Sequence, residues 1–255
     1  MRAPARVAGL SRPLRPGGTS VLMMHRLLLF AALVSAPAGV TLGDQAEADP
    51  HRPTCTSARC RKIKSFVKEH YCGRSPAGNG PDDGCEITRP TKHSPGVEVL
   101  ADYKCYEAKE KLECRQEGVP PPSVRDVLTR ELRSLGLPAN APGNISFVVL
   151  RASSWLVASA DYSWVYGEHV EVCRVVVLVD ANSHATVLRK TPFEVTDADT
   201  DMTTGWTPID IADADGTGHP EIILVGQAYE DRWFEVVSLE KKPFRTIFSG
   251  LGYYL

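Results

Sequence analysis

The segment of the chain best suited to chemistry is a short acidic stretch, residues 213–221, which reads Asp-Ala-Asp-Gly-Thr-Gly-His-Pro-Glu. Oxygen-bearing side chains occupy its first, third, fifth and ninth positions: Asp213, Asp215, Thr217 and Glu221. The two glycines between them permit a tight, partly left-handed turn. A hard cation such as calcium takes roughly six to eight oxygen ligands. A loop that presents alternate side chains inward, with a backbone carbonyl, supplies most of them, so we predict a calcium site here.

This stretch resembles the calcium loop of FG-GAP/VCBS repeats, the Asp-x-Asn/Asp-Gly-Asp-Gly-x-x-Asp/Glu turn of extracellular β-propeller blades. The resemblance covers residues 206–226 only, with strand-like runs on both sides of the loop. It implies a β-hairpin with five metal ligands: Asp213, Asp215, Thr217, the carbonyl of His219, and Glu221. Thr217 stands where the family normally has an acid, so the resemblance implies a weakened site. One repeat cannot close a propeller, so we expect the hairpin but not the family's fold.

The acidic residues also have simpler interpretations. Without a metal, residues 213–221 form an Asp/Gly-rich hairpin turn. Asp197, Asp199 and Asp201 alternate in the same way, but Met202 stands where a glycine would help the chain to turn. We therefore interpret this second stretch as a solvated acidic turn.

Common catalytic signatures are absent from the sequence, including those of serine hydrolases, zinc proteases and nucleotide-binding enzymes. The most suggestive histidine is His169, because the neighbouring Glu168 could orient its ring for acid–base catalysis. A polar strand end explains the same residues. Our first hypothesis is a non-enzymatic binding or structural module with a weak calcium-binding hairpin and an unknown protein or glycan partner. The alternative is a secreted hydrolase that combines acids of 197–221 with His169 or His219, and an inhibitor- or immunity-type protein is a third hypothesis.

Six of the seven cysteines lie between residues 55 and 114, which in an exported chain indicates disulfides. The sequence contains no Cys-x-x-Cys pair, so the cysteine spacing does not indicate a zinc site. Cys105 and Cys114 should face each other across a hairpin centred between residues 109 and 110, so we predict that they pair. Cys173 lies in an apolar run and is predicted to be a buried free thiol.

The connectivity of the four remaining cysteines stays open: Cys55, Cys60, Cys72 and Cys85. A bond between Cys55 and Cys60 is disfavoured if Cys60 is helical, because five helical residues rise about 7.5 Å.

Periodicity predicts an α+β fold, mainly an antiparallel β-sheet with two helices and a disulfide-rich N-terminal segment. Apolar residues recur at helical spacing over 58–71, and a second helix is predicted from a Ser123 cap to Gly136. Residues 97–105 and 112–116 alternate as a hairpin. Short runs rich in valine, isoleucine and aromatic residues predict further strands at 145–151, 155–163, 170–180, 184–190, 206–212, 221–228, 232–239 and 244–248.

The N-terminus has the layout of a secretory signal peptide. Arg26 precedes the apolar run 27–34, and Ala36-Pro37-Ala38 provides a small-residue exit. The run is too short to span a bilayer, which takes about 20 apolar residues. We therefore predict a signal peptide within 1–43, with translation starting at Met23 or Met24, and a secreted or periplasmic mature chain. Its expected parts are a cysteine-rich segment, 44–95, and a β-rich domain, 96–255.

The overall composition is that of a globular protein, with 43% hydrophobic and 24% charged residues. The net charge of −2 gives no reason to expect a nucleic-acid partner. The charges are unevenly spread, however. Residues 52–74 carry seven Lys or Arg, whereas 191–231 carry ten Asp or Glu and neither Lys nor Arg.

Overall fold

The computed structural model describes residues 55–73, 85–87, 90, 92–108, 111–180, 184–197, 204–228 and 231–254. Residues Gln45–Leu255 form one compact unit. The predicted signal peptide and start site lie outside the described residues, as do Asp199 and Asp201. No helix in the described part of the chain is both long enough and apolar enough to cross a membrane.

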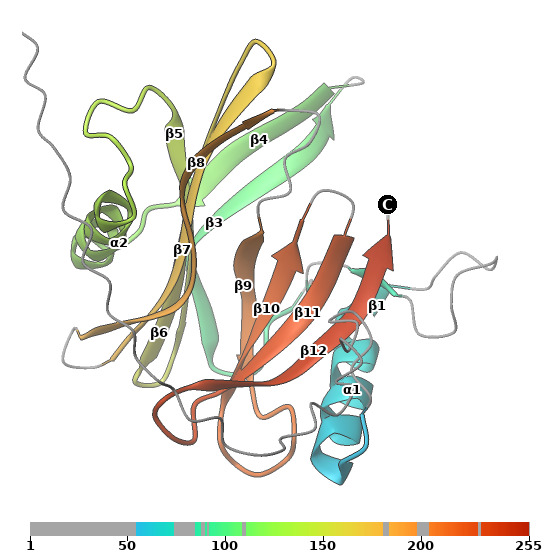
Figure 1. Ribbon diagram of the computed structural model, residues 1–255. Helices are drawn as coiled ribbons and strands as arrows, with labels where there is room; N and C mark the ends of the chain where they lie inside the picture. Colours follow the sequence, from blue (N-terminus) through green and yellow to red (C-terminus); the bar gives the residue numbers. More distant parts are fainter. Residues whose placement is uncertain are drawn as a thin grey trace, which may run out of the picture. The chain divides into compact units, whose positions relative to one another are not determined.

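The long strands form two antiparallel sheets, whereas the sequence predicts one. The first contains β3 (Val97–Ala108), β4 (Lys111–Gly118), β5 (Asn144–Ala152), β6 (Trp155–Tyr166), β7 (His169–Val179) and β8 (Ala185–Asp197). The second contains β9 (Gly205–Ala212), β10 (Glu221–Gln227), β11 (Asp231–Ser238) and β12 (Arg245–Tyr254). Their strand orders are β4-β3-β5-β6-β7-β8 and β12-β11-β10-β9 (Figure 1). A short pair, β1 (Cys72–Gly73) and β2 (Glu86–Ile87), forms a third sheet.

Each long sheet is covered on one face by a helix and packs against the other sheet on its second face. Helix α2 (Pro122–Ser134) buries Leu128 and Leu132 against the six-stranded sheet, where they meet Tyr162 and Cys173. Helix α1 (Ala58–Tyr71) covers the four-stranded sheet (Figure 1). The mainly antiparallel β structure with two helices is therefore confirmed, although the helical content is low for an α+β fold.

Strand β10 shows how the layers arise from the sequence. Side chains alternate between the two faces of a strand. Ile222 and Leu224 point into the core between the sheets, and Ile223 points into the core under α1. An unbroken apolar run is thus buried on both faces, which is typical of a strand covered on each side.

The two helices begin differently from one another. Helix α1 has the predicted bounds, and its N-cap Ser57 accepts a hydrogen bond from the Cys60 backbone amide at 3.0 Å. The predicted Ser123 cap of α2 is wrong, because the helix starts at Pro122 and Ser123 lies inside it. Proline suits the first turn because its fixed φ is helical and no amide there needs a partner. The helix is followed by Gly136 at a φ of +101°, where the chain leaves it as predicted.

Two disulfides are present near the start of the described chain, Cys55–Cys60 and Cys72–Cys85. The expectation that Cys55 and Cys60 do not pair is wrong. Cys60 is helical, but Cys55 precedes the N-cap, and the chain turns there so that the two Cα atoms lie 5.2 Å apart. A helical rise therefore does not separate them.

The other cysteine predictions concern the two sheet cysteines and Cys173. Cys173 is a buried free thiol, as predicted. Cys105 and Cys114 are cross-strand partners in the β3–β4 register. Cys114 is disulfide-bonded, but the Cys105 side chain lies outside the described residues. Their bond to each other stays a prediction.

Candidate metal centre

The acidic loop joins β9 to β10, which pair as antiparallel neighbours in the four-stranded sheet. The last residue of β9, Ala212, lies opposite Glu221, so residues 213–220 form the turn. Gly216 and Gly218 adopt positive φ values of +71° and +83°. This left-handed conformation is readily available to glycine alone, which explains how so short a loop reverses direction.

Three carboxylates converge in this turn. One oxygen each from Asp213, Asp215 and Glu221 lies within 4.8 Å of the others, a spacing that could hold a metal ion. Asp215 and Glu221 are buried, with 1% and 0% of their surface exposed, and Asp213 is exposed. The sequence therefore located a group of acids that the fold does bring together.

Backbone amides of the turn hold the carboxylates in place. The Thr217 amide donates to one oxygen of Asp213 and one of Asp215, each at 2.9 Å. The Gly218 amide donates to the second oxygen of Asp213, and the Ala214 amide donates to Glu221 Oε2 at 2.8 Å. Two further buried oxygens, Asp215 Oδ2 and Glu221 Oε1, accept no backbone hydrogen bond from the described residues and face the Arg59 guanidinium instead.

Thr217 and His219 are the other two residues of the loop to which the resemblance assigns ligand roles. The Thr217 side chain hydrogen-bonds to Asp215, which it supports as a carboxylate. The His219 side chain is exposed. Ligation by the Thr217 hydroxyl and the His219 carbonyl stays a prediction.

Arg59 is the member of this cluster that the sequence analysis missed. From the first turn of α1, its Nε contacts Asp215 Oδ2, and another guanidinium nitrogen lies 3.6 Å from Glu221 Oε1. A third contact places it 3.5 Å from Glu240. The Cys55–Cys60 disulfide closes a short ring that includes Arg59, so it fixes the start of the helix from which this side chain reaches the acids. The guanidinium thus already supplies one positive charge to the loop.

The cluster shifts the pKa values of the two buried acids in opposite directions. Burial, followed by the charges of Asp215 and Asp213, raises the pKa of Glu221 to about 7, although the Ala214 amide and Arg59 oppose this. Burial also acts to raise the pKa of Asp215. Hydrogen bonds from Thr217 and the charge of Arg59 outweigh it and hold that pKa below its usual range. Excess negative charge therefore remains around Glu221 even with Arg59 in place.

A separate buried carboxylate, Asp210, anchors neighbouring segments to β9. It accepts hydrogen bonds from the Tyr71 hydroxyl at 2.7 Å, from the Ser94 hydroxyl at 2.8 Å and from the Ile211 amide at 2.8 Å. The Ser94 amide also donates to it, at 2.9 Å. Burial and the charge of Asp210 raise the pKa of Tyr71, which keeps its hydroxyl protonated as a donor. Asp210 thus ties α1 and residues 93–94 to the sheet.

The histidine of the hydrolase hypothesis lies beside one acid of the stretch 197–221. His169 Nδ1 lies 3.1 Å from Asp197, and both side chains are more than half exposed. Asp210, another acid of the same stretch, is instead engaged by Tyr71 and Ser94.

The chain matches no family model, no curated protein and no solved structure. The geometry of the carboxylate cluster is therefore the basis on which a function is assigned.

Proposed function

We propose that the protein is a secreted or periplasmic binding or structural module, rather than an enzyme, whose loop Asp213–Glu221 holds a weakly bound calcium ion. The observation that carries this proposal is the convergence of three carboxylates, two of them buried, with one oxygen of each within 4.8 Å of the others. Arg59 pairs with Asp215 but lies 3.6 Å from Glu221 Oε1, and the pKa of Glu221 is still raised to about 7 by burial and by the charges of Asp215 and Asp213. A divalent cation among the three carboxylates would offset this repulsion.

The charge balance supports a divalent ion beside Arg59. The three carboxylates carry three negative charges when ionised, and the Arg59 guanidinium supplies one positive charge. Two negative charges are then uncompensated, and calcium carries two positive charges. Carboxylate and carbonyl oxygens are the ligands that calcium takes in proteins. With Thr217 in place of an acid, we expect a dissociation constant in the range of extracellular modules, about 10⁻⁴ to 10⁻³ M.

A calcium ion here would join two parts of the fold. Asp213 and Asp215 follow β9, and Glu221 begins β10, so the ion would close the hairpin between these strands. Removing the repulsion among three acids should stabilise the loop. Because millimolar calcium exceeds the expected dissociation constant only severalfold, the stabilisation should be about 1 kcal/mol.

The test is thermal unfolding in EGTA and in about 5–10 mM calcium, roughly ten times the expected dissociation constant. The melting temperature of the parent protein should rise by about 2–4 °C in calcium. The rise should disappear in Asp215→Ala and persist in Asp197→Ala, which removes an exposed acid outside the loop. Equal melting temperatures of the parent in both buffers would leave the metal-free acidic turn as the better interpretation. A rise lost only in Asp197→Ala would place the ion at the other acidic stretch.

Export itself has an independent test. N-terminal sequencing of the mature protein should find a start after the Ala36-Pro37-Ala38 exit. Recovery of an intact segment 1–22 would contradict both the predicted cleavage and the predicted start at Met23 or Met24.

A further inference from the structure

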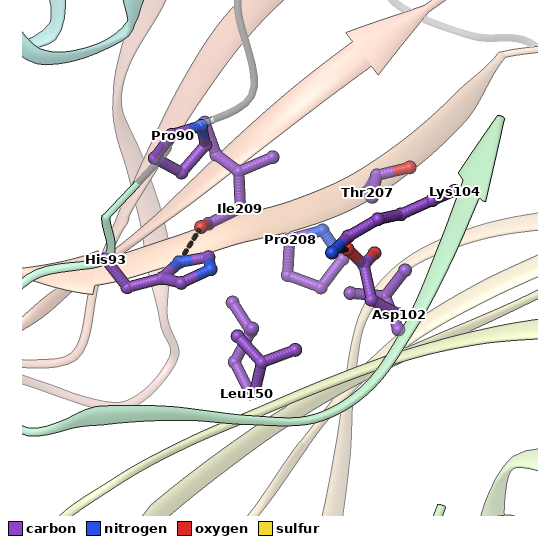
Figure 2. A pocket seen from close by; sticks show the side chains of 10 residues that line it. Pro90, His93, Asp102, Lys104, Leu150, Thr207, Pro208 and Ile209 are labelled. Atoms are coloured by element: carbon purple, nitrogen blue, oxygen red, sulfur yellow. Dashed lines mark hydrogen bonds and ion pairs between the residues drawn. The ribbon is translucent and has the colours of Figure 1, made fainter. Parts of the chain in front are cut away.

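A cavity of about 300 Å³ lies between the two sheets, away from the acidic loop. Its walls come from β3 and β5 on one side, from β9 on the other and from the segment around His93 (Figure 2). Most of the lining is apolar and includes Val99, Val148, Leu150 and Pro208. Cavities of this size and character, with a few polar groups, are typical of small-molecule sites.

Two irregularities occur in the strands that line this space. In β3, Val99 pairs with Leu150 but Ala101 pairs with Val149, so residue 100 is an extra residue in the strand. In β9, residue 209 is extra in the same way, between Pro208 and Asp210. Such bulges bend a strand and are frequent beside functional sites. Here they occur in strands that line opposite walls of the cavity.

The bulge in β9 also orients a histidine. The carbonyl of Ile209 lies 2.9 Å from His93 Nδ1. A carbonyl only accepts hydrogen bonds, so Nδ1 carries the hydrogen, and in the neutral ring Nε2 is left as an acceptor. Nε2 has no hydrogen-bond partner within the described chain. Figure 2 shows the ring extending toward Leu150 and Pro208.

The charges at the opposite end do not favour an anionic ligand. Lys104 Nζ lies 2.8 Å from Glu117 and 3.8 Å from Asp102, and Arg115 lies 3.4 Å from Glu117, so two carboxylates match the two positive charges there and leave no surplus positive charge for an anion. With its hydrogen on Nδ1, an unprotonated His93 ring presents Nε2 as an acceptor to a ligand. A group that donates a hydrogen bond is therefore preferred to a carboxylate or phosphate.

We propose that this cavity binds a neutral aromatic compound with a hydroxyl group, which donates to His93 Nε2 while the rings pack on Val99, Leu150 and Pro208. The volume supports a two-ring ligand, because a cavity of about 150 Å³ holds one benzene ring. The hydroxyl is the feature that His93 recognises. The apolar walls provide most of the affinity, and the hydrogen bond provides the selectivity.

The test compares 2-naphthol with 2-methoxynaphthalene, which has a similar shape but no donor, and with 2-naphthoate, which is anionic. Amide chemical shifts of the ¹⁵N-labelled protein are followed at about pH 8, where an ordinary histidine is neutral. We expect saturable shifts at residues lining the cavity and a preference for 2-naphthol of about three- to tenfold over the methoxy compound. Equal binding of the two, tighter binding of 2-naphthoate, or no saturable shift at the cavity would overturn the proposal.

Variants separate recognition by His93 from simple packing. His93→Phe keeps a ring but removes the acceptor, so 2-naphthol should fall to the affinity of the methoxy compound. Val99→Trp should fill the cavity and weaken both ligands at least about tenfold. Val187→Trp is the matched control, because Val187 is similarly exposed, at 40% against 38% for Val99, and does not line the cavity. Unchanged selectivity in His93→Phe, or unchanged affinity in Val99→Trp, would refute the assigned site.

Discussion

Replacing Arg59 by glutamine tests whether the loop depends on a cation from α1. The change removes the guanidinium that contacts Asp215 and lies near Glu221 and Glu240. Leaving a buried charge without its partner costs about 3–5 kcal/mol. The Arg59 side chain is 37% exposed, so water already screens part of this interaction. We therefore expect a loss of about 2–3 kcal/mol in EGTA, or roughly 4–10 °C in melting temperature.

Calcium should restore much of the lost stability, because Arg59→Gln also removes the repulsion between the guanidinium and the calcium ion. Two unit charges about 4 Å apart interact by about 1 kcal/mol even in bulk water, and a divalent ion doubles that figure. Removing about 2 kcal/mol of repulsion strengthens binding by roughly 30-fold. Millimolar calcium would then lie near 100 times the dissociation constant and stabilise the variant by about 2.7 kcal/mol. The parent should gain only about 1 kcal/mol.

The assay is thermal unfolding of both proteins in EGTA and in millimolar calcium, with isothermal titration of calcium into each. Arg61→Gln is the control, because Arg61 belongs to the same helical turn but donates to the Thr56 carbonyl. It should leave the calcium response of the parent unchanged. A smaller calcium response in Arg59→Gln than in the parent would refute the reasoning, because Arg59 would then help to build the site rather than compete for it.

Further predictions concern single side chains. Thr217→Asp should strengthen calcium binding in titration calorimetry, because it restores an acid at the fifth position, and no gain would mean that this position does not face the ion. Cys173 is 0% exposed and burial raises the pKa of its thiol to about 11, so iodoacetamide at about pH 8 should label it only in denaturant. Mass mapping without reduction should find Cys105 linked to Cys114, and a free thiol at either position would contradict the pairing. Asp210→Asn should lower the free energy of unfolding by about 2–4 kcal/mol in a urea titration, because several buried donors converge on this carboxylate; a loss below about 0.5 kcal/mol would show that the amide replaces it.

The elements of the fold were largely predictable from local pattern. Strands β9 and β10 were expected within about a residue, because apolar runs bounded by turn residues are a strong local signal. The arrangement of the strands in two sheets was not predicted. The apolar run Ile222–Val225 shows that both faces of β10 are covered, but not that α1 covers one face and the six-stranded sheet the other. Packing between segments that lie far apart in the sequence produces no periodic pattern that identifies the two segments as neighbours.

In the candidate site, too, the contacts within one turn were predictable and the contacts between distant segments were not. Asp213, Asp215 and Glu221 lie within one short turn, so their convergence follows from local spacing. Arg59 lies near the start of the described chain, and its contact with the turn depends on the packing of α1 on the four-stranded sheet. A signal for it existed in the contrast between the basic stretch 52–74 and the acidic stretch 191–231. Charge contrast indicates that two segments attract each other, but it does not select one arginine.

Arg59 also explains why the proposed calcium site should be weak. The guanidinium is tethered to α1, and the Cys55–Cys60 disulfide holds the turn that carries it, so this cation is always near the acids. A calcium ion interacts with the carboxylates twice as strongly as the singly charged guanidinium does, because it carries two charges. It must, however, bind from solution and lie close to the positive charge of Arg59. Only millimolar calcium would then fill the site. Extracellular fluids are where modules with such affinities operate, and disulfides are typical of the same oxidising environment, so the predicted export and the predicted weak affinity support each other.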